Sequence, residues 1–123
     1  MMMYPVICHY EDGGYWCEFP DLEGCFSQGD TEQEIIKNAK ESLEGYLITM
    51  LERGEQIPKA RSVKEISTDE NSFVSIIDAD ILCQTKSVRK NITLPEWLNK
   101  KAEKIGINFS QVLQEALMQK LSL

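Results

Sequence analysis

The sequence has no long hydrophobic run, only one histidine and no closely spaced pair of cysteines. A membrane-spanning helix needs about 20 mostly apolar residues, and no stretch here approaches that length. The Met1-Met2-Met3 start does not read as a signal peptide. Cys8 and Cys17 lie in apolar strand patterns, and none of the four cysteines has the close neighbour that structural zinc sites use. We therefore expect buried reduced thiols, no metal, no cofactor, no membrane contact and a cytoplasmic location.

Groups with the arrangement of a catalytic site are also scarce. His9, the single histidine, lies at the end of an expected strand, and no Ser or Cys nucleophile has an evident orienting partner. Asp12, Asp21 and Asp30 fall at turns and at a helix start, where carboxylates commonly accept local hydrogen bonds. We predict that these three are solvated loop acids, that they form no metal triad, and that the protein is not an enzyme.

Charge is divided unevenly along the 123 residues, which carry a net charge of −7. Residues 1–80 hold 17 acidic and 6 basic residues, a net charge of −11, whereas residues 81–123 hold 3 acidic and 7 basic residues, a net charge of +4. A basic segment can approach phosphates, while an acidic one repels nucleic acid and favours a basic partner. The pattern predicts two modules with different ligands.

The C-terminal segment, residues 87–123, reads as a strand from Val88 to Leu94 followed by two helices. Pro95 suits the first helical position, Gly106 ends that helix, and Ser110 is a good N-cap for the next one. A segment of this length rarely buries enough apolar surface alone, since chains below about 40 residues usually need a disulfide, a metal or a second copy. We expect a homodimer, with a core from Ile92, Leu94, Leu113 and Leu117.

The polar side of this strand has the residue types that read DNA. Alternation places Arg89, Asn91 and Thr93 on the face opposite the apolar residues. Two such strands paired about a two-fold axis fit the major groove, roughly 12 Å wide, where Arg pairs with guanine and Asn with adenine. The N-terminus of the second helix is a natural phosphate site.

Residues 89–95 and 106–110 together resemble the ribbon-helix-helix (β-α-α) DNA-binding fold. The resemblance implies that Arg89, Asn91 and Thr93 contact bases of operator double-stranded DNA, and that backbone amides near Phe109 and Ser110 hold phosphate. Lys90 departs from the apolar residue usual in the family, although its stem can lie along the ribbon. The alternative is a polar strand in an ordinary dimerisation domain.

The N-terminal domain, residues 1–80, shows the order β-β-β-α-β. The expected strands are residues 4–10, 15–19, 25–27 and 73–78, and a helix opens at Asp30 or Thr31 with Glu34 in a capping box and ends at Arg53-Gly54. We expect a polar loop over residues 55–72 and a linker over residues 81–86. The helix carries an apolar stripe, which we expect to face the sheet: Ile36, Ala39, Leu43, Leu47 and Met50.

The order of elements, with the motifs Gly14-Tyr15, Phe19-Pro20-Asp21-Leu22, Gly24-Cys25 and Gly29-Asp30-Thr31-x-x-Glu34, resembles the HicB family of antitoxins over nearly the whole chain. The resemblance implies an α+β fold, in which a partial ribonuclease H-like domain without the catalytic site precedes a ribbon-helix-helix dimer. It also implies that the first domain binds a small basic HicA-like messenger-RNA endonuclease and covers its catalytic histidine. The second would repress the protein's own operon. The sequence leaves open whether dimers assemble into tetramers.

Trp16 and Glu18 are the candidate toxin-binding residues, because their parity opposes that of Tyr15, Cys17 and Phe19. If the helix covers one face of the sheet, Trp16 and Glu18 lie on the open face, where a tryptophan can anchor an interface. Packing of Trp16 against another subunit or the linker is an equal alternative. A different function also fits the sequence: a stand-alone ribbon-helix-helix repressor, whose N-terminal domain binds a ligand or oligomerises.

Overall fold

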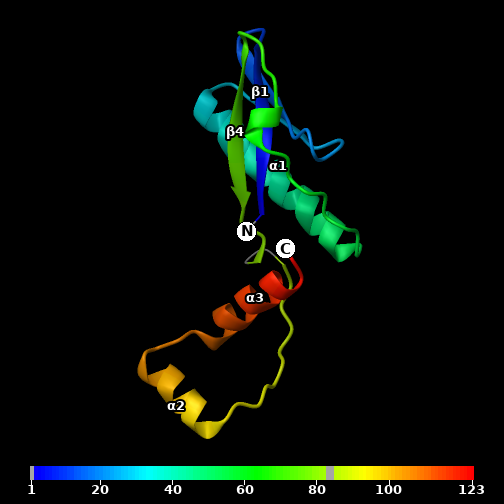
Figure 1. Cartoon of the computed structure of the whole chain (residues 1–123). Helices are drawn as coiled ribbons and strands as arrows, with labels where there is room; N and C mark the ends of the chain where they lie inside the picture. The colour runs from blue at the N-terminus through cyan, green and yellow to red at the C-terminus, as the bar shows by residue number, and fades with distance from the viewer. Residues whose placement is uncertain (1, 83–84) are drawn as a thin grey trace. The chain divides into compact units, whose positions relative to one another are not determined.

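The structure is a computed structural model that describes residues 2–82 and 85–123, in two units that meet between Thr85 and Lys86. Figure 1 shows the sheet and long helix of the first unit and the two helices of the second. The first unit has the order β-β-β-α-β, as predicted, and its sheet is antiparallel with strand order β3-β2-β1-β4. Its strands are β1 (Met2–Glu11), β2 (Gly14–Glu18), β3 (Phe26–Gly29) and β4 (Ser72–Ala79).

The first hairpin fixes the register of the sheet. Its two-residue turn consists of Asp12 and Gly13, with φ values of 52° and 78°, as the common tight hairpin turn requires. Glu11 therefore pairs with Gly14, and His9 pairs with Trp16. The turn thus decides which side chains of β1 and β2 are neighbours.

Helix α1 (Glu32–Glu52) covers one face of the sheet. Its N-cap is Thr31, whose side chain accepts a hydrogen bond from the Glu34 N–H at 3.1 Å, which confirms the predicted start. Gly29 lies so close to the helix that a Cβ there would meet the Ile35 nitrogen at 2.8 Å, so the chain can pass only without a side chain. The buried stripe differs from the prediction at both ends: Ile35 is fully buried whereas the predicted Ile36 is half-buried, and the predicted Met50 is also only half-buried.

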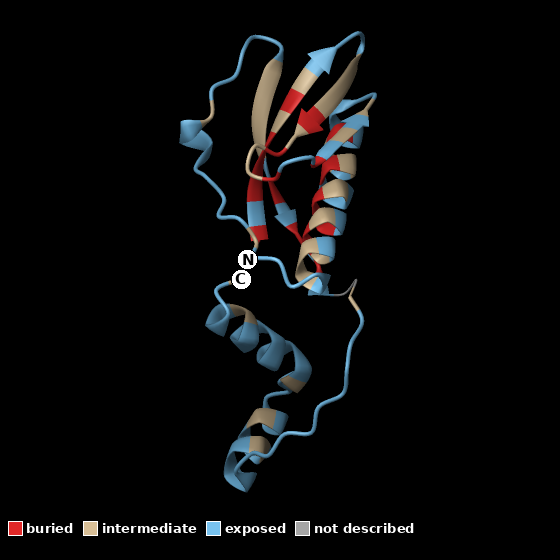
Figure 2. Ribbon diagram, turned by 90° about the vertical axis from the view of Figure 1, so that its right-hand side faces the viewer, coloured by how far each residue is buried: buried red, intermediate tan, exposed pale blue. Residues whose placement is uncertain are grey.

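The core lies between α1 and the sheet, where the buried residues gather in Figure 2. Cys8 and Cys17 are fully buried, as predicted, and stand opposite each other on β1 and β2. Burial raises the pKa of the Cys8 thiol to about 12 and that of Cys17 to about 11. These thiols are therefore protonated apolar groups in the folded protein, not nucleophiles. Cys83 lies outside the described residues.

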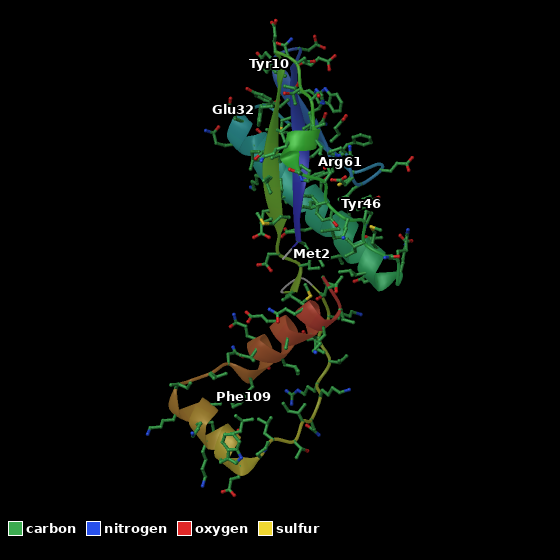
Figure 3. All side chains as sticks on the ribbon, in the orientation of Figure 1. Met2, Tyr10, Glu32, Tyr46, Arg61 and Phe109 are labelled. Atoms are coloured by element: carbon green, nitrogen blue, oxygen red, sulfur yellow. The ribbon has the colours of Figure 1, made fainter. Side chains whose placement is uncertain are left out.

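The loop between α1 and β4 contains a short 3-10 helix, η1 (Val63–Glu65), which Figures 1 and 2 place on the side of the sheet away from α1. Arg61, labelled in Figure 3, anchors this loop: its Nε donates to the Asp21 Oδ1 at 2.7 Å and its backbone N–H to Oδ2 at 3.1 Å. Because the Asp21 side chain is only 6% exposed, the prediction that it is a solvated loop acid is wrong. Asp12 and Asp30 are exposed.

The residues that follow β4 pack against the first unit. Ala79 and Ile81 are buried, and the Glu44 side chain on α1 accepts a hydrogen bond from the Asp80 N–H at 2.7 Å. The beginning of the expected linker over residues 81–86 therefore packs on the first unit. The apolar side chain of Ile81 accounts for this packing, since its burial removes apolar surface from water.

The second unit contains α2 (Glu96–Lys104) and α3 (Phe109–Lys120). Pro95, predicted at the first helical position, is instead the N-cap of α2. Gly106 follows the C-terminal end of this helix, where the Ile107 N–H donates to the Ala102 carbonyl at 3.1 Å. The expected strand from Val88 to Leu94 is not formed in the single chain, so that prediction is wrong for the monomer. A strand needs a neighbour for its backbone hydrogen bonds, and none of the described residues supplies one.

No helix of the described chain is both long and apolar enough to span a membrane. Within residues 2–82 and 85–123, no group of three or more His, Cys, Asp or Glu side chains has a geometry that would hold a metal ion.

Candidate functional site

The open face of the first unit holds both predicted toxin-binding residues. Trp16 and Glu18 alternate along β2 with Cys17, which is fully buried on the α1 side. Both are half-buried. The structure thus places them together on the face that the parity argument predicted, although their role in toxin binding stays a prediction.

Trp16 is held in place by its cross-strand neighbour. Its ring stacks on His9 with centroids 4.2 Å apart and planes at 19°, and its Nε1–H donates to the Glu11 Oε2 at 3.0 Å. Glu18 lies on the other side of His9, with its Oε2 3.8 Å from the His9 Nε2. Trp16 is therefore an aromatic surface flanked by two carboxylates. Such a surface suits a Lys or Arg side chain, which can pair with a carboxylate and contact the ring face.

The His9 ring has one unusual atom. Its Nε2 is covered from solvent and has no hydrogen-bond partner among the described residues, because the contact to Glu18 is too long for a hydrogen bond. In the described part of the chain the Trp16 ring stacks on His9, and packing of Trp16 against another subunit or the linker stays the alternative prediction. Sequence reasoning missed His9 and Glu11 as members of this cluster. The Asp12-Gly13 turn was the available signal, because a two-residue turn places His9 opposite Trp16.

Next to Trp16, at the hairpin end of the sheet, is a hollow of about 620 Å³. Four carboxylates line it and no Lys or Arg does. An acidic hollow beside a half-buried aromatic ring favours a basic partner, because opposite charges speed encounter and like charges are disfavoured. The acidic side chains that line it are Glu11, Asp12, Asp30 and Glu34.

Apolar side chains extend the open face away from the hollow. Phe26 on β3 is 59% exposed, Ile76 on β4 is 49% exposed and Met3 on β1 is 43% exposed. The register places Phe26 beside Glu18. Large apolar side chains next to charged ones form the usual composition of an interface, with an apolar centre and a polar rim.

The second unit carries the predicted DNA-contacting residues in a segment without secondary structure. Arg89, Asn91 and Thr93 are all exposed, and the unit as a whole has a net charge of +4 over residues 86–123. In the single chain they do not form the flat polar face expected of a ribbon, because that face requires a paired strand. Their contact with bases stays a prediction.

The predicted dimer-core residues are uncovered in the single chain. Ile92 is 51% exposed, Leu113 36% and Leu117 51%, and no described residue of this unit is buried. Ile92 and Leu94 line a hollow of about 450 Å³ together with Phe109, which begins α3 and is labelled in Figure 3. Exposed apolar side chains in so small a unit are consistent with a partner that covers them, and the homodimer stays a prediction.

The start of α3 differs from the prediction by two residues. Asn108, not Ser110, is the N-cap, and its side chain accepts a hydrogen bond from the Gln111 N–H at 3.1 Å. Asn, Asp and Ser cap helices about equally well, so the sequence alone did not separate the two positions. Phe109 and Ser110 therefore lie in the first turn, where free backbone N–H groups can hold a phosphate.

Comparison with known proteins identifies the family. The family model described as "HicB_like antitoxin of bacterial toxin-antitoxin system" matches residues 4–118. An uncharacterized 14.9 kDa protein in the rep-hol intergenic region of Haemophilus phage HP1 is 34% identical over 101 residues, 79% of this chain and 76% of the phage protein.

Solved structures of similar fold match almost the whole chain. The crystal structure of the Burkholderia pseudomallei antitoxin HicB is 28% identical and has a TM-score of 0.70 over 98% of this chain and 99% of that one. A toxin-antitoxin complex from Streptococcus pneumoniae is 26% identical and has a TM-score of 0.63 over 97% and 98% of the two chains. With an α+β architecture that, in the described residues, comprises a four-stranded antiparallel sheet and three α-helices, the chain belongs to the HicB-like antitoxin family of bacterial toxin-antitoxin systems.

Proposed function

We propose that this chain neutralises a small basic HicA-like messenger-RNA endonuclease through its first unit and represses its own operon through its second. The observation that carries the first half is the open sheet face, where Trp16 lies between Glu11 and Glu18 beside an acidic hollow. A protein that binds RNA must present basic groups to phosphates, and the same groups fit this face. The antitoxin thus competes with RNA for them.

The proposed mechanism is coverage of the toxin's active site. Phe26, Ile76 and Met3 supply further apolar contact area on the same face as Trp16, while the carboxylates steer the approach of a positively charged toxin. Binding rather than catalysis is the proposed role of every residue on this face. The toxin's catalytic histidine would be shielded from RNA by the complex as a whole.

The second half of the proposal concerns DNA. Two copies of the segment from Val88 to Leu94 would pair into an antiparallel ribbon, with Ile92 and Leu94 turned toward the helices and Arg89, Asn91 and Thr93 toward the major groove. The exposed apolar side chains of Leu113 and Leu117 support this, because pairing would cover them. Phosphates flanking the bases would bind the first-turn amides of Phe109 and Ser110.

Co-expression tests the antitoxin role. The chain is produced together with the small basic protein encoded beside its gene, and growth and co-purification are measured. We expect the neighbouring protein alone to arrest growth, and co-expression to restore growth and yield a stable complex.

A matched control uses the Arg89→Ala variant, which lacks a proposed base contact but keeps the open sheet face, so it should rescue growth equally well. A soluble, folded chain that neither rescues nor co-purifies would contradict the antitoxin role. It would favour the stand-alone repressor instead.

A further inference from the structure

His9 lies among groups that suit a positive charge. The register of the sheet pairs it with Trp16 on β2 and with the uncharged Ser72 on β4. The Trp16 ring is nearly parallel to the His9 ring, with centroids 4.2 Å apart, and the face of an indole attracts a cation. The His9 side chain is 26% exposed, so water reaches part of the ring although Nε2 is covered.

Two carboxylates of the first hairpin lie around this stack. Glu18 on β2 holds its Oε2 3.8 Å from the His9 Nε2, and Glu11 on β1 accepts the Trp16 Nε1–H at 3.0 Å. Glu18 is 35% exposed. It can therefore reach either His9 or a basic group that arrives from solvent.

The turn before β4 supplies a third carboxylate, Asp69. It accepts hydrogen bonds from the Ser72 Oγ–H at 2.7 Å and from the Asn71 N–H at 2.9 Å. These two bonds, and to a smaller extent the charge of His9, hold the pKa of Asp69 below its ordinary value, so this carboxyl stays ionised. Among the residues that the structure describes, no lysine or arginine forms an ion pair with any of the three carboxylates.

The covered Nε2 atom shows that the site is incomplete while His9 is neutral. A polar atom that is kept from water without a hydrogen-bond partner is unfavourable, and such atoms are rare in folded proteins. In the protonated ring both nitrogens are donors, so a small movement of Glu18 gives Nε2 a charge-assisted hydrogen bond. Histidine is the side chain that gains a proton as the pH falls from 8 to 5.

We propose that His9 is a pH switch in the toxin-binding face. The protonated ring draws Glu18 into an ion pair and so removes this carboxylate from the contact with the basic toxin. The inference rests on the proposed antitoxin function, because Glu18 acts on the toxin only if this face binds it. Proton binding at His9 and toxin binding at Glu18 therefore oppose each other.

The coupling has a definite sign and an upper limit. A basic toxin group beside Glu18 competes for the carboxylate and repels the imidazolium, so the complex holds the proton less strongly than the free chain does. The Kd for the toxin therefore rises as the pH falls. One proton can change Kd by at most about tenfold per pH unit.

Nuclear magnetic resonance of the full-length chain tests the switch, because His9 is the only histidine in the sequence. The isotope-labelled chain is titrated from pH 8 to pH 5, once alone and once with unlabelled toxin. We expect the His9 ring signals to titrate in the free chain, and the midpoint to lie at lower pH in the complex. A midpoint that stays in place or moves to higher pH would overturn the proposal. This test needs no variant.

Titration calorimetry at pH 7.5 and pH 5.5 supplies a second test with matched variants. His9→Gln keeps a planar polar side chain beside Trp16 but takes up no proton. Since the toxin has titrating groups of its own, the informative quantity is the difference between variants. The unaltered chain should lose more affinity on acidification than His9→Gln does, and Glu18→Gln should also lose less than the unaltered chain.

The two possible failures are distinguishable. Equal losses of affinity in the unaltered chain and a folded His9→Gln variant would overturn the switch and leave toxin binding intact. Absence of toxin binding at both pH values, by a chain that circular dichroism shows to be folded, would overturn the proposed function and the switch with it.

Discussion

Replacing Trp16 with alanine should separate toxin binding from folding. In the free protein the Trp16 ring stacks on His9 at 4.2 Å and donates a hydrogen bond to Glu11 at 3.0 Å. Truncating a fully buried tryptophan costs about 3–5 kcal/mol, but Trp16 is only half-buried and its hydrogen bond is solvent-exposed, so we expect a loss of about 2 kcal/mol in the free energy of unfolding. The melting temperature should then fall by about 10 °C.

The expected effect on binding is of similar size but of different origin. If Trp16 anchors the toxin interface, the alanine variant loses about 2 kcal/mol of binding free energy, or roughly 30-fold in Kd. The variant should remain folded, because ordinary domains have about 5–15 kcal/mol of stability. Circular dichroism and thermal melts check the fold, and titration calorimetry with the purified toxin measures Kd.

Two matched variants complete the test. Trp16→Phe keeps a ring over His9 and loses only the N–H, so it should bind within about fivefold of the unaltered chain, because an exposed hydrogen bond contributes at most about 1 kcal/mol. Tyr10→Ala removes an aromatic residue that is 50% exposed but lies on the α1 side of the sheet. The Kd of this variant for the toxin should equal that of the unaltered chain. Wild-type affinity of a folded Trp16→Ala variant would refute the placement of the interface.

Three further predictions concern the second unit and the core. Arg89→Ala and Asn91→Ala should each lose about 1–3 kcal/mol of discrimination between operator and unrelated DNA, while toxin affinity is kept; parallel loss of both in a gel-shift and calorimetry series would indicate misfolding instead. Leu113→Asp should give a chain that no longer dimerises through the second unit and no longer binds DNA, because it places a charge in the proposed interface. An unchanged mass by light scattering together with unchanged DNA binding would contradict that placement. Burial raises the pKa values of the Cys8 and Cys17 thiols to about 12 and about 11, so these thiols ionise more readily in the unfolded chain. The free energy of unfolding, measured by urea titration, should therefore be full below pH 9 and fall as the pH rises above it. An unchanged free energy of unfolding up to pH 11 would show that these thiols are accessible in the folded protein.

Much of the first unit was predictable because its signals are local. The β-β-β-α-β order, the Asp12-Gly13 turn and the Thr31 cap each depend on a few consecutive residues with well-known preferences. The choice between Ile35 and Ile36 was not predictable in the same way. Both are apolar neighbours at the border of the helix stripe and both fit its spacing, and the structure buries Ile35.

The errors arose where a residue's environment does not follow from its immediate neighbours in the sequence. Asp21 is buried beside Arg61, which lies 40 residues later in the chain and donates hydrogen bonds to it. No local sequence pattern predicts that pair. The segment from Val88 to Leu94 alternates like a strand, yet a strand forms only when its backbone groups find a neighbour. A single chain lacks that neighbour within the described residues, so the strand stays a prediction for the proposed dimer.

The measurement that tests the account most directly is inhibition of the toxin with purified components. The small basic protein encoded beside this gene is incubated with a messenger RNA and increasing amounts of this chain, and intact RNA is measured. The account predicts that cleavage falls in proportion to the added antitoxin and stops once every toxin molecule is bound, with Arg89→Ala as effective as the unaltered chain. Undiminished cleavage at a large excess of folded chain would contradict it.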